Sequence, residues 1–113
     1  MAIIIVEGKL SKKDFQKARE EYQGYIKLTI DIKRQKVALG GEYHADAEKK
    51  LLDQGSKQEN LWGGGVNLET KQWETNAIIN LRSGKNDSTE ILDPQTRKKF
   101  LKIAKGILRD HVK

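Results

Sequence analysis

The chain has 113 residues, of which 22 are Lys or Arg, 16 are Asp or Glu and none is Cys. This length predicts one domain, over residues 1–113, with one modest hydrophobic core. The lack of cysteine excludes disulfides, cysteine-ligated metal centres and thiol nucleophiles. No apolar run approaches the roughly 20 residues of a membrane span, and the N-terminus lacks a signal-peptide core. We therefore expect a soluble, cytoplasmic protein that does not bind membranes.

The positive charge of the chain is concentrated near its C-terminus. The net charge is +6 for the whole sequence. Residues 93–113 carry seven Lys or Arg and two Asp, whereas residues 1–92 carry fifteen bases and fourteen acids. Clustered charge favours an anionic partner, while scattered charge mainly favours solubility.

The first elements of the chain are a strand and a helix. Residues 2–6 are mostly β-branched, which predicts a short strand buried on both faces. Ser11 and Asp14 match a capping box, and apolar residues follow at helical spacing. We expect a helix over residues 12–23 that ends at Gly24.

A change to two-residue periodicity predicts a hairpin in the middle of the chain. Apolar and polar residues alternate over 25–33, and a second strand follows over 36–39. Its turn at 34–35 lacks the favoured Asn-Gly or Asp-Gly pair. Residues 45–54 are rich in helix formers, and Gly55 follows as a stop signal.

The second half of the chain predicts one or two strands and a final helix. Residues 58–68 are ambiguous, because Gly63–Gly65 would weaken or bulge a strand. Residues 73–82 alternate as a strand does, and Asp93-Pro94 starts a helix. The fold class is therefore α+β, with a mixed or mostly antiparallel sheet of four to five strands. About three helices pack on one face of this sheet, in the order β-α-β-β-α-β-(β)-α.

Four ionisable residues recur at every second position of an acid-rich stretch: Glu42, His44, Asp46 and Glu48. In an extended chain they would share one face, as in a metal or acid–base site. In a helix, which the alanines favour, His44 pairs with Glu48 and Glu42 with Asp46. Carboxylates in a first helical turn also stabilise the helix without any function. Further metal ligands would have to come from Asp53, Glu59 or His111.

The same region carries a resemblance to a known family. The segments GGEYHADAE (residues 40–48), GSKQENLWG (residues 55–63) and INLR (residues 79–82) resemble a family of short prokaryotic proteins catalogued only as a domain of unknown function. The resemblance runs nearly end to end and implies no activity. It ranks six polar residues as site candidates: Glu42, His44, Asp46, Trp62, Asn80 and Arg82.

The last helix carries a row of cations. Lys98, Lys102, Lys105 and Arg109 recur at i, i+4, i+7 and i+11, and Arg97 flanks them. Such a row suits the phosphates of a nucleic acid, although most charged helix faces are only solvated. Aromatic residues for base stacking are sparse, and the two tryptophans are more typical of a core.

Three functions follow from these patterns. The first is a module that binds RNA or another polyanion through the basic helix. The second is a small phosphodiesterase or toxin-like ribonuclease, with His44 as acid or base and Arg82 on the phosphate charge. Glu42, Asp46 or Glu48 would then orient His44 or hold a divalent metal, the one cofactor candidate. The third is a homodimer or a partner of another small protein.

Overall fold

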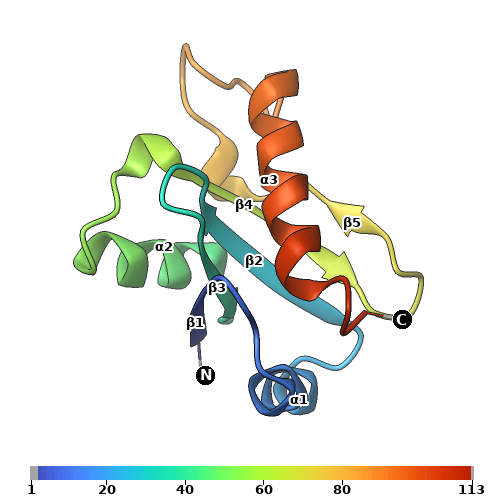
Figure 1. The fold of residues 1–113 in the computed structure, drawn as a ribbon. Helices are drawn as coiled ribbons and strands as arrows, with labels where there is room; N and C mark the ends of the chain where they lie inside the picture. The colour runs from blue at the N-terminus through green and yellow to red at the C-terminus, as the bar shows by residue number, and fades with distance from the viewer. Residues whose placement is uncertain (1–2, 113) are drawn as a thin grey trace.

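The computed structural model describes residues 3–112, which contain three α-helices, two short 3-10 helices (η1 and η2) and five strands. The elements are β1 (Ile3–Glu7), α1 (Lys12–Glu21), β2 (Tyr25–Asp31), β3 (Lys36–Gly40), α2 (His44–Asp53), η1 (Gln58–Asn60), β4 (Leu61–Asn67), β5 (Trp73–Glu74), η2 (Ile78–Asn80) and α3 (Pro94–Leu108). The strands form one antiparallel sheet in the order β1-β3-β2-β4-β5 (Figure 1). The predicted α+β class and the predicted numbers of helices and strands are confirmed.

The helices begin near the predicted residues. Ser11 caps α1 by accepting a hydrogen bond from the backbone N–H of Asp14 at 3.0 Å. Asp93 caps α3 in the same way, accepting from the N–H of Thr96 at 2.9 Å. The longest helix, α3, has 15 residues. Within residues 3–112, no helix combines the length and apolar character needed to cross a membrane.

β2 and β3 form the predicted hairpin, and a buried carboxylate holds its turn. Asp31 accepts hydrogen bonds from the backbone N–H groups of Lys33 at 3.0 Å and Arg34 at 2.9 Å. Its second oxygen accepts from the Ser56 hydroxyl at 2.7 Å. Gln35 completes the turn in the left-handed region, with φ +56°. The Asp31 side chain thus stabilises a reversal that lacks Asn-Gly.

One face of the sheet carries the larger core, under α1 and α3. The alternation of β2 places Ile26, Leu28 and Ile30 on this face, where all three are fully buried. Phe100 and Ala104 of α3 pack in the same cluster. Figure 1 shows α3 crossing in front of β2 and β4. This face fixes the long axis of α3 and leaves its opposite side in solvent.

The opposite face is covered by α2, so the prediction that all helices pack on one face is wrong. Ala47 and Leu51 of α2 pack against Ala38 of β3 and Leu61 of β4. Thr29 of β2 is also fully buried on this side of the strand. The central strands carry small or apolar residues on both faces, and both faces therefore need cover.

β1 lies at the edge of the sheet and packs on both faces as expected, although most of its side chains are only partly buried. It pairs with β3 alone, from Ile3 opposite Gly40 to Glu7 opposite Lys36. The last of these pairs is also an ion pair, with Lys36 Nζ 3.3 Å from Glu7 Oε1. Ala2, the first residue of the predicted strand, lies outside the described residues.

The glycine triplet lies inside β4, which is a regular central strand without a bulge. β4 pairs with β2 in consecutive register along its whole length, from Leu61 to Asn67. A Cβ at Gly63 would lie 2.6 Å from Cβ of Ala77, and one at Gly64 would lie 2.7 Å from the ring of Phe100. Glycine is therefore required here by close packing on both faces.

Residues 73–82 do not form the predicted strand. Only β5 (Trp73–Glu74) pairs with β4, and the chain then leaves the sheet and forms η2. Ile78 and Leu81, predicted on opposite strand faces, are both in solvent at 80% and 55% exposure. The segment is a loop in which single residues such as Ala77 and Asn80 are buried, and its apolar alternation does not correspond to the two faces of a strand.

Candidate functional site

The acid-rich stretch does not form a single face of four groups. α2 begins at His44, and Glu42 precedes it with an exposed side chain. Asp46 is also exposed, whereas His44 and Glu48 are half-buried and lie one helical turn apart. The structure therefore keeps His44 and Glu48 together and leaves Glu42 and Asp46 in solvent.

His44 packs over the glycines of β4. Its Nε2 donates a hydrogen bond to the carbonyl oxygen of Gly64 at 2.7 Å, which places the imidazole proton on Nε2. Burial lowers the pKa of His44, and the nearby Lys27 lowers it further, against the opposing effect of the Gly64 hydrogen bond. The imidazole is thus neutral near pH 7, and Nδ1 carries its lone pair.

Arg82 closes the end of β4 and covers Trp62. Its guanidinium carbon lies 4.0 Å from the centroid of the Trp62 ring, a cation–π contact. The terminal nitrogens donate to the backbone carbonyls of Glu59, at 3.3 Å, and Leu61. Trp62 itself is only 9% exposed and packs in the core under α3. The stacked pair thus holds the strand end in place.

Glu48 and Arg82 influence each other across the α2–η2 contact. Burial raises the pKa of Glu48, and the charge of Arg82 partly offsets this. Burial likewise lowers the pKa of Arg82, with Glu48 opposing the shift. Oε2 of Glu48 and Nε of Arg82 are both buried without a hydrogen-bond partner among the described residues. The two side chains therefore form a desolvated pair of opposite charge that does not close into an ion pair.

Beside this pair lies a small surface hollow of about 270 Å³, which we call the Arg82 hollow. It is lined by Gln58, Glu59, Trp62, Arg82 and Lys85. His44 is not part of this lining. The structure thus brings Trp62 and Arg82 to one hollow and Glu48 near it, while His44 faces the backbone of β4 instead.

Asn80 is fully buried and its side-chain amide contacts only backbone groups. The oxygen accepts from the N–H of Gly63 at 2.8 Å. The nitrogen donates toward the carbonyls of Gly63 at 2.9 Å, Thr89 at 3.0 Å and Thr75 at 3.2 Å. Both the oxygen and the nitrogen of the amide are thus engaged within the fold. The structure thus gives Asn80, a predicted site residue, an architectural position.

The predicted metal ligands are not gathered around one point. Across residues 3–112, no group of three or more His, Asp or Glu side chains is arranged to hold an ion. His111 stacks on Phe15 with ring centroids 4.8 Å apart, and its Nε2 donates to the carbonyl of Leu10 at 3.0 Å. This contact lies under α1, on the face of the sheet opposite α2.

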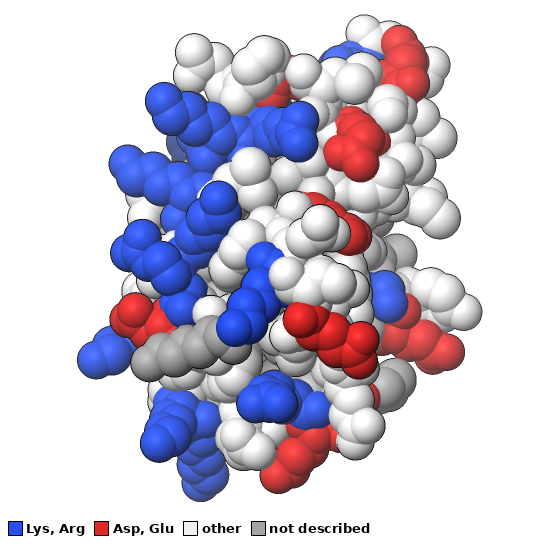
Figure 2. Space-filling model, turned by 90° about the vertical axis from the view of Figure 1, so that its right-hand side faces the viewer, with Lys and Arg blue, Asp and Glu red and all other residues white. Residues whose placement is uncertain are grey.

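The cations of α3 are all exposed to solvent. They are Arg97, Lys98, Lys99, Lys102, Lys105 and Arg109. In the part of the chain that the structure describes, the ion pair of Lys36 with Glu7 is the one formed, so no cation of α3 lies within 4.0 Å of a carboxylate. Figure 2 shows Lys and Arg gathered along the left-hand side, where α3 lies, and most Asp and Glu toward the other side.

Two hollows flank α3 and share Lys102 in their linings. One, of about 520 Å³, is lined by Leu92, Pro94, Arg97, Lys98, Leu101, Lys102 and Lys105. The other, of about 610 Å³, lies between α3 and the turn after β2. Sequence reasoning missed both. The walls of the larger hollow come from distant segments, whereas the smaller one is lined by residues 92–105 alone. The sequence does contain one signal for the larger hollow, which is Gly106 within a run of residues that otherwise favour a helix.

Comparison with known proteins gives a family but no activity. A family model described as "Protein of unknown function (DUF5674)" matches residues 4–107. The resemblance to a family without an assigned function is thereby confirmed. No curated protein matches the chain, and no solved structure matches it. Its function therefore has to be argued from its own residues.

Proposed function

We propose that this chain, which belongs to the DUF5674 family of proteins of unknown function, binds RNA or another polyanion through α3. The binding surface is the basic stripe, defined as Arg97, Lys98, Lys102, Lys105 and Arg109. One observation carries the proposal: all five side chains are exposed, and none has a carboxylate within ion-pair distance among residues 3–112. Their charges are therefore available to an anionic partner.

The length of the basic stripe suits a chain of phosphates. Lys98 and Arg109 are eleven residues apart on one helix, which corresponds to about 16 Å at 1.5 Å per residue. Each lysine or arginine that neutralises a phosphate releases condensed counterions. Binding by the stripe should therefore weaken steeply as the salt concentration rises.

The chemistry of the surface favours contact with phosphates over contact with bases. The α3 hollows described above are lined by no aromatic side chain. Trp62 is covered by Arg82, and Trp73 packs against the core. Base stacking, which single-strand recognition uses, has no exposed platform on this helix. We therefore expect little dependence on nucleotide sequence.

Reversal of three charges tests the proposal. The variant Lys98→Glu, Lys102→Glu, Lys105→Glu should elute from heparin and from immobilised RNA at much lower salt than the unmodified protein. The matched control is Lys49→Glu, Lys50→Glu, Lys57→Glu, which changes the net charge equally at exposed positions in and after α2. Because α2 covers the other face of the sheet, this control should keep most of the retention.

Two results would contradict the proposal. One is unchanged retention of the α3 variant at every salt concentration. The other is an equal loss in both variants, which would show that total charge rather than the basic stripe governs binding. Circular dichroism of both variants establishes that the helices have formed.

A further inference from the structure

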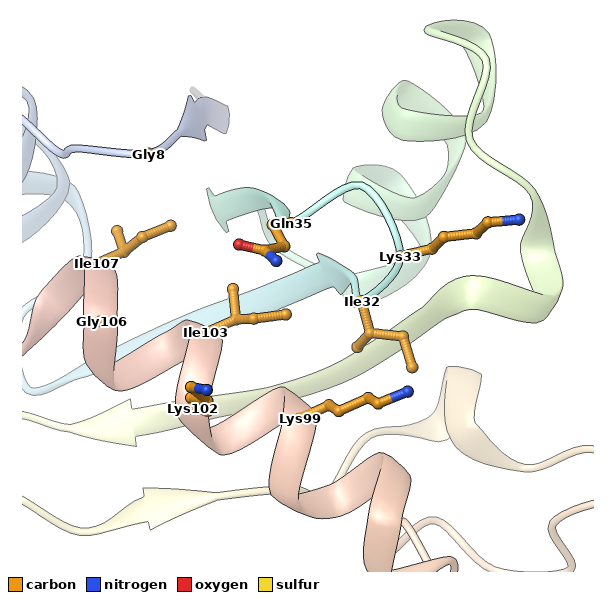
Figure 3. Close-up of a pocket in the computed structure, with 9 residues that line it drawn as sticks. All are labelled: Gly8, Ile32, Lys33, Gln35, Lys99, Lys102, Ile103, Gly106 and Ile107. Carbon is orange, nitrogen blue, oxygen red and sulfur yellow. The ribbon is translucent and has the colours of Figure 1, made fainter.

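The larger hollow beside α3 is a groove with an apolar floor and a basic rim, which we call the isoleucine groove. It is lined by Gly8, Ile32, Lys33, Gln35, Lys99, Lys102, Ile103, Gly106 and Ile107 (Figure 3). Its walls are α3 on one side and the turn between β2 and β3 on the other. A volume of about 610 Å³ lies in the range of small-molecule sites.

The chemical character of the groove changes along its length. In Figure 3, Lys33 and Lys99 extend at one end, beside Ile32. Ile103 lies in the middle with Gln35 and Lys102 beside it, and the other end is formed by Gly106, Ile107 and Gly8. The groove follows α3 from Lys99 to Ile107, a distance of about 12 Å at 1.5 Å per residue. One end is therefore cationic and the other apolar.

Gly106 keeps the apolar end open, although packing within the fold does not require a glycine there. Glycine inside a helix is about 1 kcal/mol less favourable than alanine. A Cβ at Gly106 would meet no other atom within 4 Å, and its φ is not in the left-handed region. A side chain at this position would instead occupy the groove. The space beside the helix backbone is thus the structural consequence of this glycine.

The lysines at the cationic end form no ion pair within the described residues, and Lys99 interacts with Asp93 only over a longer distance. Among residues 3–112, Lys33 and Lys99 have no carboxylate within 4.0 Å. Both are exposed, so their ammonium groups can move toward a ligand held on the isoleucine floor. The end of the groove beside Lys33 and Lys99 therefore suits an anionic group, and the end beside Gly106 suits a hydrocarbon group.

We propose that the isoleucine groove binds a free monocarboxylate with an unbranched hydrocarbon tail. The carboxylate would lie between Lys33 and Lys99, and the tail would run over Ile103 to the space beside Gly106. Burial of each methylene of the tail contributes about 0.8 kcal/mol of transfer free energy in general. This proposal does not depend on the polyanion-binding function, because Lys102 is the one residue of the basic stripe that lines the groove.

Titration calorimetry with three probes tests this division of the groove. Decanoate has both the head and the tail, decanol has the tail without the charge, and acetate has the charge without the tail. We expect saturable one-to-one binding of decanoate, at least tenfold weaker binding of decanol, and no detectable binding of acetate. Equal affinity for decanoate and decanol, or no binding of decanoate, would overturn the proposal.

Variants place the binding in this groove. Gly106→Leu adds a good helix former and fills the apolar end, so it should weaken decanoate binding at least tenfold while heparin retention stays unchanged. The matched control is Gln95→Leu, which adds the same side chain to α3 at an exposed position outside both hollows. Lys33→Gln with Lys99→Gln should remove the preference for decanoate over decanol.

The outcomes separate this proposal from the polyanion function. Lys98→Glu with Lys105→Glu should lose heparin retention and keep decanoate binding, since neither residue lines the groove. Unchanged decanoate binding in Gly106→Leu would mean adventitious binding elsewhere and would overturn the proposal. So would a dimer that Gly106→Leu dissociates, because a second copy would then fill the groove. Binding to anionic phospholipid vesicles without binding of monomeric decanoate would also overturn it.

Discussion

The side-chain amide of Asn80 takes the place of a neighbouring strand for Gly63. It accepts from the Gly63 N–H at 2.8 Å and donates toward the Gly63 carbonyl at 2.9 Å. β5 pairs with β4 only at Gly65 and Val66, so without this amide the edge of β4 would be unpaired at Gly63. A single side chain thus continues the sheet where the backbone has left it.

Replacement of Asn80 by alanine should destabilise the protein by about 3 kcal/mol, because buried backbone groups would lose their partners. The groups affected are the N–H of Gly63 and the carbonyls of Gly63, Thr75 and Thr89. Urea unfolding followed by circular dichroism measures the change. Asn76→Ala is the control, since the hydrogen bonds of the Asn76 side-chain amide are exposed and should contribute about 0.5 kcal/mol. Equal effects of the two variants would contradict this account of Asn80.

Gly64→Ala should also be strongly destabilising, by about 3 kcal/mol, because the added methyl overpacks the core. The new Cβ would lie 2.7 Å from the Phe100 ring and would collide with the backbone oxygen of Glu74. Neither the Phe100 ring of α3 nor the Glu74 backbone of β5 can move away without disturbing the packing of the sheet. Thermal unfolding of the variant measures the effect.

Gly106→Ala provides the matched comparison for Gly64. It adds the same methyl group in a helix, where no atom lies within 4 Å of the new Cβ. The variant should gain up to about 1 kcal/mol of stability from helix propensity. A loss of stability in both variants would contradict the open surroundings of Gly106.

The parts of the fold that the sequence predicts are those with a local cause. The β2–β3 hairpin follows from the alternation of apolar residues, and α3 follows from its cap at Asp93 and its apolar stripe. The exposure of the basic stripe follows in turn, because burial of Phe100 and Ala104 directs the opposite side of α3 to solvent.

The parts that the sequence does not predict depend on contacts between distant segments. The position of α2 on the second face depends on the pairing of β3 and β4 with β2, which brings Ala38 and Leu61 to the same face of the sheet. Residues 75–92 show the same limit, since Asn80 and Asn86 hold this loop through hydrogen bonds to backbone groups. Polar residues of this kind look like site candidates in a sequence.

The candidate sites divide in the same way. The pairing of His44 with Glu48 is a property of helical spacing and is readable from the sequence. The contact of Arg82 with Trp62 and the isoleucine groove both join segments that are far apart in the chain. The periodicity of apolar residues in a sequence does not predict such tertiary contacts.

The stability of the fold should fall as the pH drops below about 6.5, because His44 resists protonation when folded. Burial and the nearby Lys27 lower the pKa of His44 from its usual 6.5. The unfolded chain therefore binds the proton first, and stability that is complete above pH 6.5 is lost as the pH falls through the folded-state pKa. Urea unfolding at about pH 7.5 and about pH 5.5 measures the loss. The variant His44→Gln should show a smaller loss over this window, and an identical loss would rule out His44 as its source.

Glu48→Gln should stabilise the protein at neutral pH and have little effect in acid. Burial raises the pKa of Glu48 above its usual 4.5, with the attraction of Arg82 insufficient to cancel the shift. A group of this kind stabilises the fold in its neutral form, and that contribution is lost as the pH rises through the folded-state pKa. Glutamine keeps the neutral form at every pH, so the difference in unfolding free energy between variant and parent should grow as the pH rises from about 4 to about 7. The control is Asp46→Asn, which neutralises an exposed carboxylate of the same helix. A destabilised Glu48→Gln at neutral pH would show instead that attraction to Arg82 outweighs the loss of hydration at this buried carboxylate.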